Sequence, residues 1–426
     1  MRLAVFTNMY PARVTTFFER DIRSLVAAGI EVHIFAIHPL DAGQWRYTLD
    51  LLGPDVLPRD RVHHLNQSAA LRQLRPWPIA NARRFLADAV RILASAARFG
   101  PVPVAKTAYL LPKAWTWARQ FRDRFDHVLA YWGNYAATCA YLFHRLSNST
   151  TPFSMWLHAG TDLYFRPVFL RQKARYADRI ITCCDFNRAY LGRAFPELAV
   201  ELARKVHVCY HGLDLAAFPF TPEGRLGNRL IAVGRLAHDK GFDDLVRAVH
   251  LLTQRGVVTQ LELVGDGPEE RPLRALVAEL GLASQVRFRG WLPFREVQAA
   301  MRDATILVHP STGLGDGLPN VIREAMALGT PVIASRVAGI PEALDDGRCG
   351  VLVPPRNVAA LAEAIDALRW DQQRRGELAE RARRHTEDKF DMWRNGARLA
   401  EVLRTTPSRA STLHSAPPAT HPVWST

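Results

Sequence analysis

The sequence has few cysteines, and none in the spacing of a structural site. Five cysteines occur in 426 residues, and no pair has the C-x-x-C spacing. An odd number without that spacing indicates neither a disulfide framework nor a zinc site. Long apolar runs are also missing. The longest stretch without Asp, Glu, Lys or Arg, 127–144, contains Gly133, Asn134 and Thr138, which favours a buried strand and a helix start over a membrane span.

The N-terminus has no secretory signal, since the chain runs directly into an apolar strand at residues 3–6. We therefore expect a cytoplasmic protein. A length of 426 residues is too great for one ordinary core, so two domains are expected. The composition, 48% hydrophobic and 23% charged, is typical of a globular protein.

Positive charge is concentrated in one part of the chain, within a net charge of +14. Residues 61–124 contain twelve Lys or Arg and two acids. Arg84, Arg91 and Arg98 are seven residues apart and would share one helix face. A solvated helix face, an anionic membrane surface and nucleic acid are the three interpretations. Nucleic acid is the least favoured, because no recognised nucleic-acid module accompanies the charge.

Apolar strands alternate with helical segments along both halves of the chain. In the first half, a strand at 3–7, a helix at 16–28 and a strand at 31–37 form a βαβ unit. Further strands are expected at 128–131, 154–157, 179–182 and 206–210, and a basic helical region at 71–117.

A cluster of Pro and Gly at 218–227 separates the halves, and the pattern then restarts. Strands are expected at 229–233, 260–264, 286–289, 306–309, 331–334 and 350–353, with helices at 243–254, 269–280, 294–302 and 320–328. The predicted fold class is α/β, with two doubly wound parallel sheets and a ligand cleft beyond their strand ends.

Two carboxylates eight residues apart mark the most informative stretch. Asp316 lies in a Gly/Pro-rich loop, and Glu324 lies in the helix that follows. Gly315 and Gly317 let the backbone approach a ligand, and the nearby helix N-terminus suits phosphate. Asp316 could accept hydrogen bonds from sugar hydroxyls, and Glu324 from a ribose diol. The alternative is an ordinary loop–helix boundary with a packed Glu.

The run Asp-Gly-Leu-Pro-Asn…Glu-Ala-Met-Ala…Gly-Thr-Pro-Val-Ile-Ala resembles the paired-acid signature of family 4 of the retaining glycosyltransferases, of the exopolysaccharide or colanic-acid type. The usual signature has Glu at both ends, whereas Asp316 keeps the charge and loses one methylene. The resemblance implies the GT-B fold, with two Rossmann-like domains facing a cleft. It also implies that Glu324 binds the donor ribose and that Asp316 contacts the transferred sugar. The donor would also meet Gly317, Leu318 and Pro319.

Two cations follow a strand in Gly234-Arg235-Leu236…Lys240-Gly241, where a diphosphate would need them. A surface turn with solvated charges is the alternative. In the resembled family this motif is the diphosphate clamp. The resemblance also places Gly265 in a turn near the nucleotide, and the base beside the backbone at Gly290 and Trp291.

In the first half, His158 follows a strand and could donate to sugar or phosphate oxygens. The resemblance makes it the residue of this half that touches the transferring sugar. Residues 10–17 resemble the family's sugar- and acceptor-facing loop, in which Thr16 matches and Thr15 replaces a Glu. Residues 390–393 resemble the family's final helix, which crosses back onto the first domain.

The resulting predictions are a first domain at 1–218 with a crossing helix at 388–404, a nucleotide-sugar-binding domain at 225–387, and a disordered tail at 405–426. No Asp-x-Asp metal–diphosphate motif occurs, so no metal or other cofactor is expected. We predict a retaining glycosyltransferase acting on a UDP- or GDP-sugar and a glycan or lipid-linked acceptor, at the inner membrane face. A nucleotide-sugar epimerase on this fold, or a non-catalytic scaffold protein, is the alternative.

Overall fold

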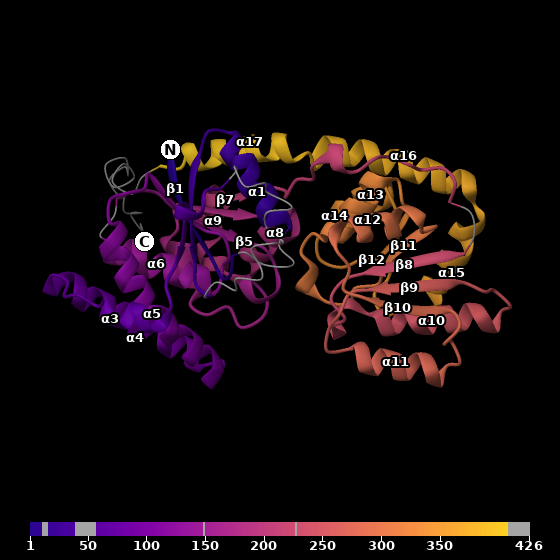
Figure 1. Cartoon of the computed structure of the whole chain (residues 1–426), viewed down its shortest axis with the longest axis horizontal. Coiled ribbons are helices and arrows are strands. Elements are labelled where there is room, and N and C mark those ends of the chain that lie inside the picture. Colours follow the sequence, from indigo (N-terminus) through magenta and orange to yellow (C-terminus); the bar gives the residue numbers. More distant parts are fainter. Residues whose placement is uncertain (11–15, 39–56, 148–149, 226–227, 408–426) are drawn as a thin grey trace, which may run out of the picture.

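The computed structural model describes residues 1–10, 16–38, 57–147, 150–225 and 228–407. Two parallel β-sheets form its two halves, each with helices on both faces (Figure 1). The seven-stranded sheet has the order β3-β2-β1-β4-β5-β6-β7, and the six-stranded sheet has the order β10-β9-β8-β11-β12-β13. All strand pairs within the two sheets are parallel. The predicted α/β fold class is confirmed.

The first half contains strands β1 (Arg2–Thr7), β2 (Glu31–Ala36), β3 (Val62–His64), β4 (His127–Ala130), β5 (Phe153–Leu157), β6 (Arg179–Thr182) and β7 (Val206–Val208). Its helices are α1 (Thr16–Ala27), α3 (Gln67–Arg72), α4 (Ile79–Ala97), α5 (Pro101–Phe121), α6 (Tyr135–Leu146), α7 (Leu170–Tyr176), α8 (Asp185–Ala194) and α9 (Ala199–Lys205). The sequence did not predict β3, which is only three residues long.

The second half contains strands β8 (Arg229–Val233), β9 (Gln260–Val264), β10 (Val286–Gly290), β11 (Ile306–His309), β12 (Val332–Ser335) and β13 (Val351–Val353). Its helices are α10 (Phe242–Gln254), α11 (Glu270–Glu279), α12 (Phe294–Asp303), α13 (Asn320–Leu328), α14 (Ile340–Ala343), α15 (Val358–Trp370), α16 (Gln372–Lys389) and α17 (Met392–Arg404). Every strand predicted in this half is present, with ends shifted by at most one residue.

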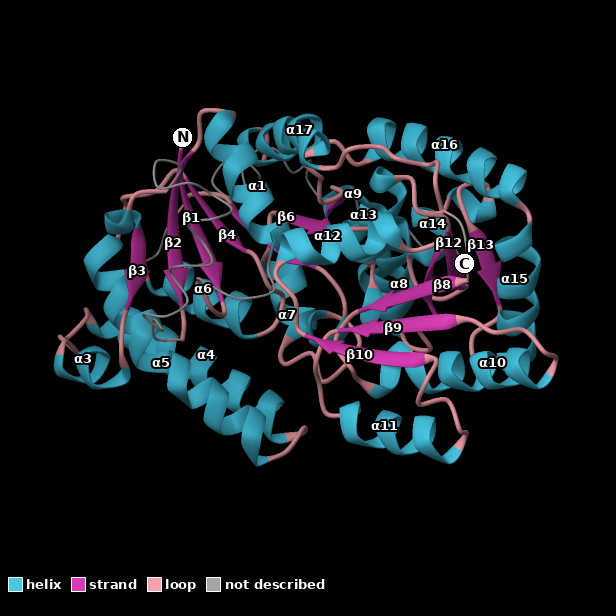
Figure 2. Ribbon diagram, turned by 45° about the vertical axis from the view of Figure 1, so that its right-hand side comes forward, coloured by secondary structure: helices cyan, strands magenta, loops and turns pink. Residues whose placement is uncertain are grey.

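Alternate residues of the central strands supply the cores on the two faces of each sheet. In β1, Ala4 and Phe6 join the core under α4, α5 and α6, whereas Leu3 and Val5 join the core under α1 and α17. This alternation is the two-residue period of a strand buried on both faces. In Figure 2, helices lie on both faces of each sheet.

The chain returns to the first half at its end. In Figure 1, α16 runs along the second half and α17 continues over the first, where it contacts α1. The backbones of Leu213 and Met392 join at the junction, with Met392 N donating to Leu213 O over 3.0 Å. A Cβ at Gly212 would lie 2.0 Å from Met392 Cα, so this crossing requires glycine. The predicted tail, 405–426, falls almost wholly outside the described residues.

The basic segment predicted as helical consists mainly of α4 and α5. Pro101 and Pro103 lie in the first turn of α5, where a missing N–H costs little, and Pro112 lies inside the helix without ending it. Arg84 and Arg91 lie on α4 and Arg98 directly follows it, and all three are exposed. Among the described residues, no helix is both long and apolar enough to span a bilayer.

Candidate active site

The loop that carries Asp316 is fastened to the turn that carries Lys240. Asp316 ends the short 3-10 helix η6 (Leu314–Asp316), and Lys240 ends η5 (His238–Lys240). The carbonyl oxygen of Asp239 accepts from Thr312 N over 2.9 Å and from Ser311 Oγ over 3.0 Å. The two predicted donor motifs, 76 positions apart, therefore form one structural unit at the strand ends of the second sheet.

Asp316 is buried between two basic side chains. Lys240 Nζ donates to its Oδ1, and His309 Nε2 lies 2.8 Å from its Oδ2. Burial alone would raise the pKa of Asp316, but His309 and Lys240 outweigh it and hold that pKa well below its usual range. Asp316 is therefore a carboxylate at any physiological pH. His309, at the end of β11, was not singled out from the sequence.

Glu324 forms a nearly buried ion pair with Arg20 of α1. Arg20 Nη2 donates to Glu324 Oε1 over 2.9 Å, and both side chains are less than a tenth exposed. The Arg20 guanidinium also lies 5.3 Å from the ring centre of Phe294 and 5.6 Å from that of Phe218. Arg20 was missed because no motif marks it. The pair joins the first half to the second.

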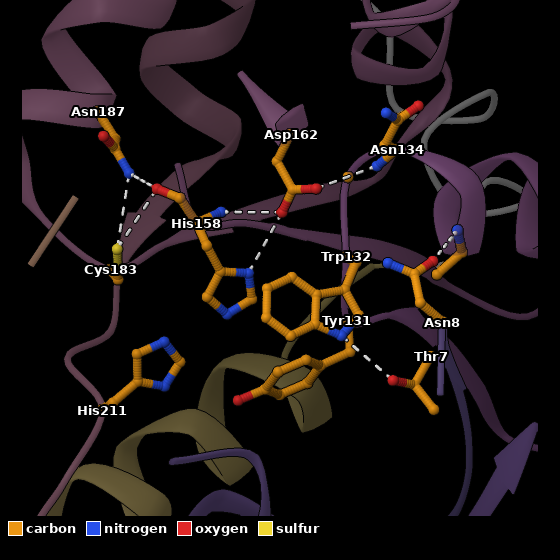
Figure 3. Close-up of polar contacts among 12 residues, drawn as sticks. Thr7, Asn8, Tyr131, Trp132, Asn134, His158, Asp162, Cys183, Asn187 and His211 are labelled. Atoms are coloured by element: carbon orange, nitrogen blue, oxygen red, sulfur yellow. Dashed lines mark hydrogen bonds and ion pairs between the residues drawn. The ribbon is translucent and has the colours of Figure 1, made fainter. Parts of the chain in front are cut away.

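His158 lies at the end of β5 in a setting of aromatic rings and one carboxylate. Its Nδ1 is 3.4 Å from Asp162 Oδ2, and its Nε2 has no hydrogen-bond partner among the described residues. Figure 3 shows His158 beside Trp132, Tyr131 and His211, with ring centres 4.5 Å from Trp132 and 4.9 Å from His211. Asp162 also accepts from the backbone N–H of His158 over 3.3 Å. Asp162 therefore holds this loop.

A buried hydrogen-bond network holds His211, the ring stacked on His158. His211 Nδ1 lies 2.6 Å from Asp21 Oδ2, which also accepts from the Tyr131 hydroxyl. Burial lowers the pKa of His211 to about 4, although Asp21 acts in the opposite direction. Arg323 of α13 donates to the carbonyl oxygen of His211, so α13 contacts the first half through two neighbouring residues.

An open cavity of about 360 Å³ lies between the two halves. Predicted residues from both halves line it: His158, Asp316, Gly317, Leu318 and Pro319. The halves approach closely here, because a Cβ at Gly317 would lie 3.0 Å from the Cβ of Ala159. The structure thus brings His158 of the first half together with the paired-acid loop, whereas Thr16 and Glu324 do not line this cavity.

The other predicted donor residues lie at the strand ends around this loop. Arg235 is exposed, and Trp291 is half-buried. A Cβ at Gly265, whose φ is +132°, would lie 1.9 Å from Gly234 O, so this turn requires glycine. Gly265 N donates to Gly290 O over 2.8 Å, which aligns the ends of the three strands.

A second cavity of about 390 Å³ lies between α1 and α12. Thr16, Glu19, Arg20, Phe218 and Phe294 are among its lining residues. Glu19 Oε2 is buried without a hydrogen-bond partner among the described residues. Burial raises the pKa of Glu19 to about 8. Thr15, the other predicted loop residue, falls outside the described residues.

Metal-type ligands gather at one place in the described part of the chain, away from the residues named above. Asp345, Cys349 and His385 each offer an atom, and the three atoms lie within 4.8 Å of one another. Arg348 contacts Asp345 over 3.4 Å. Neither Asp316 nor Glu324 belongs to this group.

Comparison with known proteins extends the geometric result. Residues 227–371 match the family described as "Glycosyl transferases group 1". The putative colanic acid biosynthesis glycosyltransferase WcaL of Escherichia coli K12 is 27% identical over 95% of this chain and 100% of its own. The amylovoran biosynthesis glycosyltransferase AmsK of Erwinia amylovora is 25% identical over 95% and 99%.

Among solved structures, Anabaena Alr3699/HepE in complex with UDP-glucose superposes with a TM-score of 0.68. It covers 95% of this chain and 100% of its own, at 17% identity. The expected GT-B fold is therefore confirmed.

Proposed function

Because residues 227–371 form a glycosyl transferases group 1 domain within a GT-B fold, we propose that this protein is a retaining glycosyltransferase. It moves a sugar from a UDP- or GDP-sugar to a glycan or lipid-linked acceptor without a metal ion. A nucleotide-sugar donor is supported by the structural neighbours, which bind UDP or UDP-glucose. The names of two relatives matched over almost their full length, colanic acid and amylovoran biosynthesis glycosyltransferases, support a role in exopolysaccharide biosynthesis. A cytoplasmic location is part of the proposal.

One observation carries the proposal: His158 and the paired-acid loop line a single cavity between the halves. A reacting sugar in that cavity would meet a histidine from one sheet and a carboxylate loop from the other. Closure of the two halves around the substrates would exclude water, which strengthens the electrostatic interactions inside. An acceptor would enter from the side of the first half, where the loop at Thr15 and Thr16 lies.

The donor is assigned to the second half, with its diphosphate between Arg235 and Lys240. Lys240 is bound to Asp316, and a diphosphate would compete for the same cation. Glu324 takes the ribose, and Asp316 and His158 take the transferred sugar. Gly265, Gly290 and Trp291 are assigned to the end of the donor that carries the base. Gly317, Leu318 and Pro319 are assigned to the end that carries the sugar.

In the proposed reaction, the bond between the anomeric carbon and the diphosphate oxygen breaks. A bond from the acceptor oxygen forms on the same face, and the departing phosphate takes the acceptor proton. Arg235 and Lys240 stabilise the charge that develops on the leaving diphosphate. No nucleophile suited to double displacement is assigned to this site.

The test is to incubate the purified protein with UDP- and GDP-sugars in the presence of EDTA and to assay free nucleoside diphosphate. We expect nucleoside diphosphate to be released from one of these sugar donors. In Lys240→Ala the rate of release should fall about 100-fold or more, because the ammonium group that stabilises the leaving diphosphate is removed. Arg247→Ala is the matched control, since Arg247 is exposed on α10.

Each other outcome opposes a definite part of the proposal. Equal rates in Lys240→Ala and wild type would oppose the diphosphate assignment. Conversion of the donor sugar without any acceptor product would indicate an epimerase. Absence of donor binding in direct titration would indicate a non-catalytic scaffold.

A further inference from the structure

Helix α4 presents an outward face on which arginines lie among exposed apolar side chains. Ile79, Leu86 and Val90 are 71%, 60% and 66% exposed. The arginines exposed along α4 and at the residue after it are Arg83, Arg84, Arg91 and Arg98. The opposite face is buried in the core through Phe85, Ala89, Ile92 and Ala96. The outward face therefore combines exposed aliphatic surface with positive charge.

Carboxylates are absent from this outward face. Asp88 is the acid within α4, and it is buried and bound to Arg145 over 2.7 Å. The patch continues to the start of α5, where Val102 is 60% exposed and Lys106 is also exposed. Six of the thirteen exposed large hydrophobic residues in the described chain lie within residues 71–102, so exposed apolar surface and positive charge are concentrated in the same place.

A groove lies beside α4 and extends the charged surface. It has a volume of about 860 Å³ and is lined by Arg91, Arg98, Arg145 and Arg171. Arg171 is bound to Glu197 over 2.6 Å. Asp88, which also lines the groove, contacts Arg145 over 2.7 Å and Arg91 over 3.8 Å. The four guanidinium groups still outnumber these two acids. Such a groove suits a phosphate group.

We propose that the outward face of α4 and the start of α5, the α4 face, docks on an anionic lipid surface. Apolar side chains enter the acyl boundary while arginines contact lipid phosphates. Nucleic acid would need the cations but not the aliphatic residues. In Figures 1 and 2, α4 and α5 lie along the outer edge of the first half, so the surface is open to a bilayer. The purpose of docking rests on the proposed function, because it would bring the protein to a lipid-linked acceptor.

The experiment is flotation of the full chain with vesicles, without donor. Vesicles of phosphatidylethanolamine and phosphatidylglycerol are compared with vesicles of phosphatidylcholine. We expect binding to the anionic vesicles that weakens with salt. Arg83→Gln/Arg98→Gln is expected to weaken it about 30-fold, at about 5-fold for each arginine. Leu86→Ser/Val90→Ser removes the apolar contribution and is expected to weaken binding about 10-fold or more.

A matched control separates the effect of arginines on the α4 face from the effect of lowering the net charge. Arg247→Gln/Arg374→Gln removes two exposed arginines from α10 and α16 and should leave binding within about 2-fold, because distant exposed charges are screened. An equal loss in this control would overturn the assignment to α4. Equal binding to the neutral and anionic vesicles would overturn the choice of an anionic lipid.

A second measurement does not rely on variants with weakened vesicle binding. All five cysteines are buried, so a surface cysteine can be labelled selectively. Ala87→Cys on the α4 face, labelled with an environment-sensitive fluorophore, should shift to shorter wavelength on anionic vesicles. Ala359→Cys, exposed on α15, should not. An unshifted label on α4 would contradict the proposal. Nucleotide release, assayed without vesicles, tests the proposed function separately.

Discussion

At the scale of single residues, the charges between the halves are paired across large distances in the chain. Arg20 and Glu324 are 304 positions apart, and both are nearly buried. Removing one partner of a buried pair leaves the other charge uncompensated. We expect Arg20→Met to lower the free energy of unfolding by about 3 kcal/mol, measured by urea denaturation.

Two variants separate this pair from general effects of losing an arginine. Arg23→Met, on the same helix, loses a more exposed pair with Asp214 and should cost about 1 kcal/mol or less. Arg20→Met/Glu324→Gln should recover part of the loss, because the carboxylate is no longer left charged and unpaired. Strictly additive losses in the double variant would show that the two side chains are not coupled.

For Glu19, the neighbour of Arg20, we expect a substitution to raise the free energy of unfolding rather than lower it. Burial raises its pKa to about 8, so the folded protein binds a proton that the unfolded chain releases above its ordinary pKa. The stability held by the protonated form is therefore lost as pH rises from about 4.5 to 8. Glu19→Gln should raise the free energy of unfolding by about 4 kcal/mol at pH 8 and change it little at pH 4.5. A gain of the same size at both pH values would exclude titration as its cause.

At the scale of elements, the site depends on how closely η6 approaches the loop after β5. A Cβ at Gly317 would lie 3.0 Å from Ala159 Cβ and 3.2 Å from His158 O. Both are attached to the backbone, so Gly317→Ala must push the two loops apart by some tenths of an ångström. Displacements of this order cost catalysis far more than stability. We expect at least about a 10-fold loss of turnover with an unfolding free energy within about 1 kcal/mol of wild type.

Gly376→Ala is the matched control for that change. Gly376 lies in α16, and nothing lies within 4 Å of its Cβ position. The substitution should leave turnover unchanged and stabilise the protein by about 0.5–1 kcal/mol. Full turnover in Gly317→Ala would mean that the paired-acid loop tolerates displacement, and the cavity assignment would lose its support.

Helices and strands were predicted from the sequence more completely than the partners of the site residues. Apolar periodicity and glycine turns located every strand of the second sheet, because buried parallel strands read as short apolar runs between helices. The motifs also selected His158 and the Asp316 loop, which line one cavity. Arg20 escaped detection because its partner Glu324 lies 304 positions away and only the tertiary fold brings the two together. His309 lies seven positions before Asp316, but it ends an apolar strand and belongs to no motif. β3 escaped because three residues carry too little pattern.

At the scale of the whole molecule, buried and half-buried histidines contribute to the response to acid. Burial lowers the pKa of His63 and His211 to about 4 and that of His127 to about 3. These side chains stay neutral in the folded protein while the unfolded chain takes up protons below about pH 6.5. The stability associated with the neutral forms is therefore lost as pH falls from about 6.5 towards 4.

Three histidines in this state add about 4 kcal/mol per pH unit near pH 5, and the raised pKa of Glu19 opposes them by about 1.4 kcal/mol. We therefore expect the free energy of unfolding, from urea denaturation at pH 7, 6 and 5, to fall by about 3 kcal/mol per pH unit at the acid end. In Glu19→Gln the opposing contribution is gone, so the slope should steepen to about 4 kcal/mol per pH unit. A flat profile between pH 6 and 5 would mean that these histidines reach protons without unfolding. Asp316 is not the cause of such a decline, because His309 and Lys240 keep its pKa below this range.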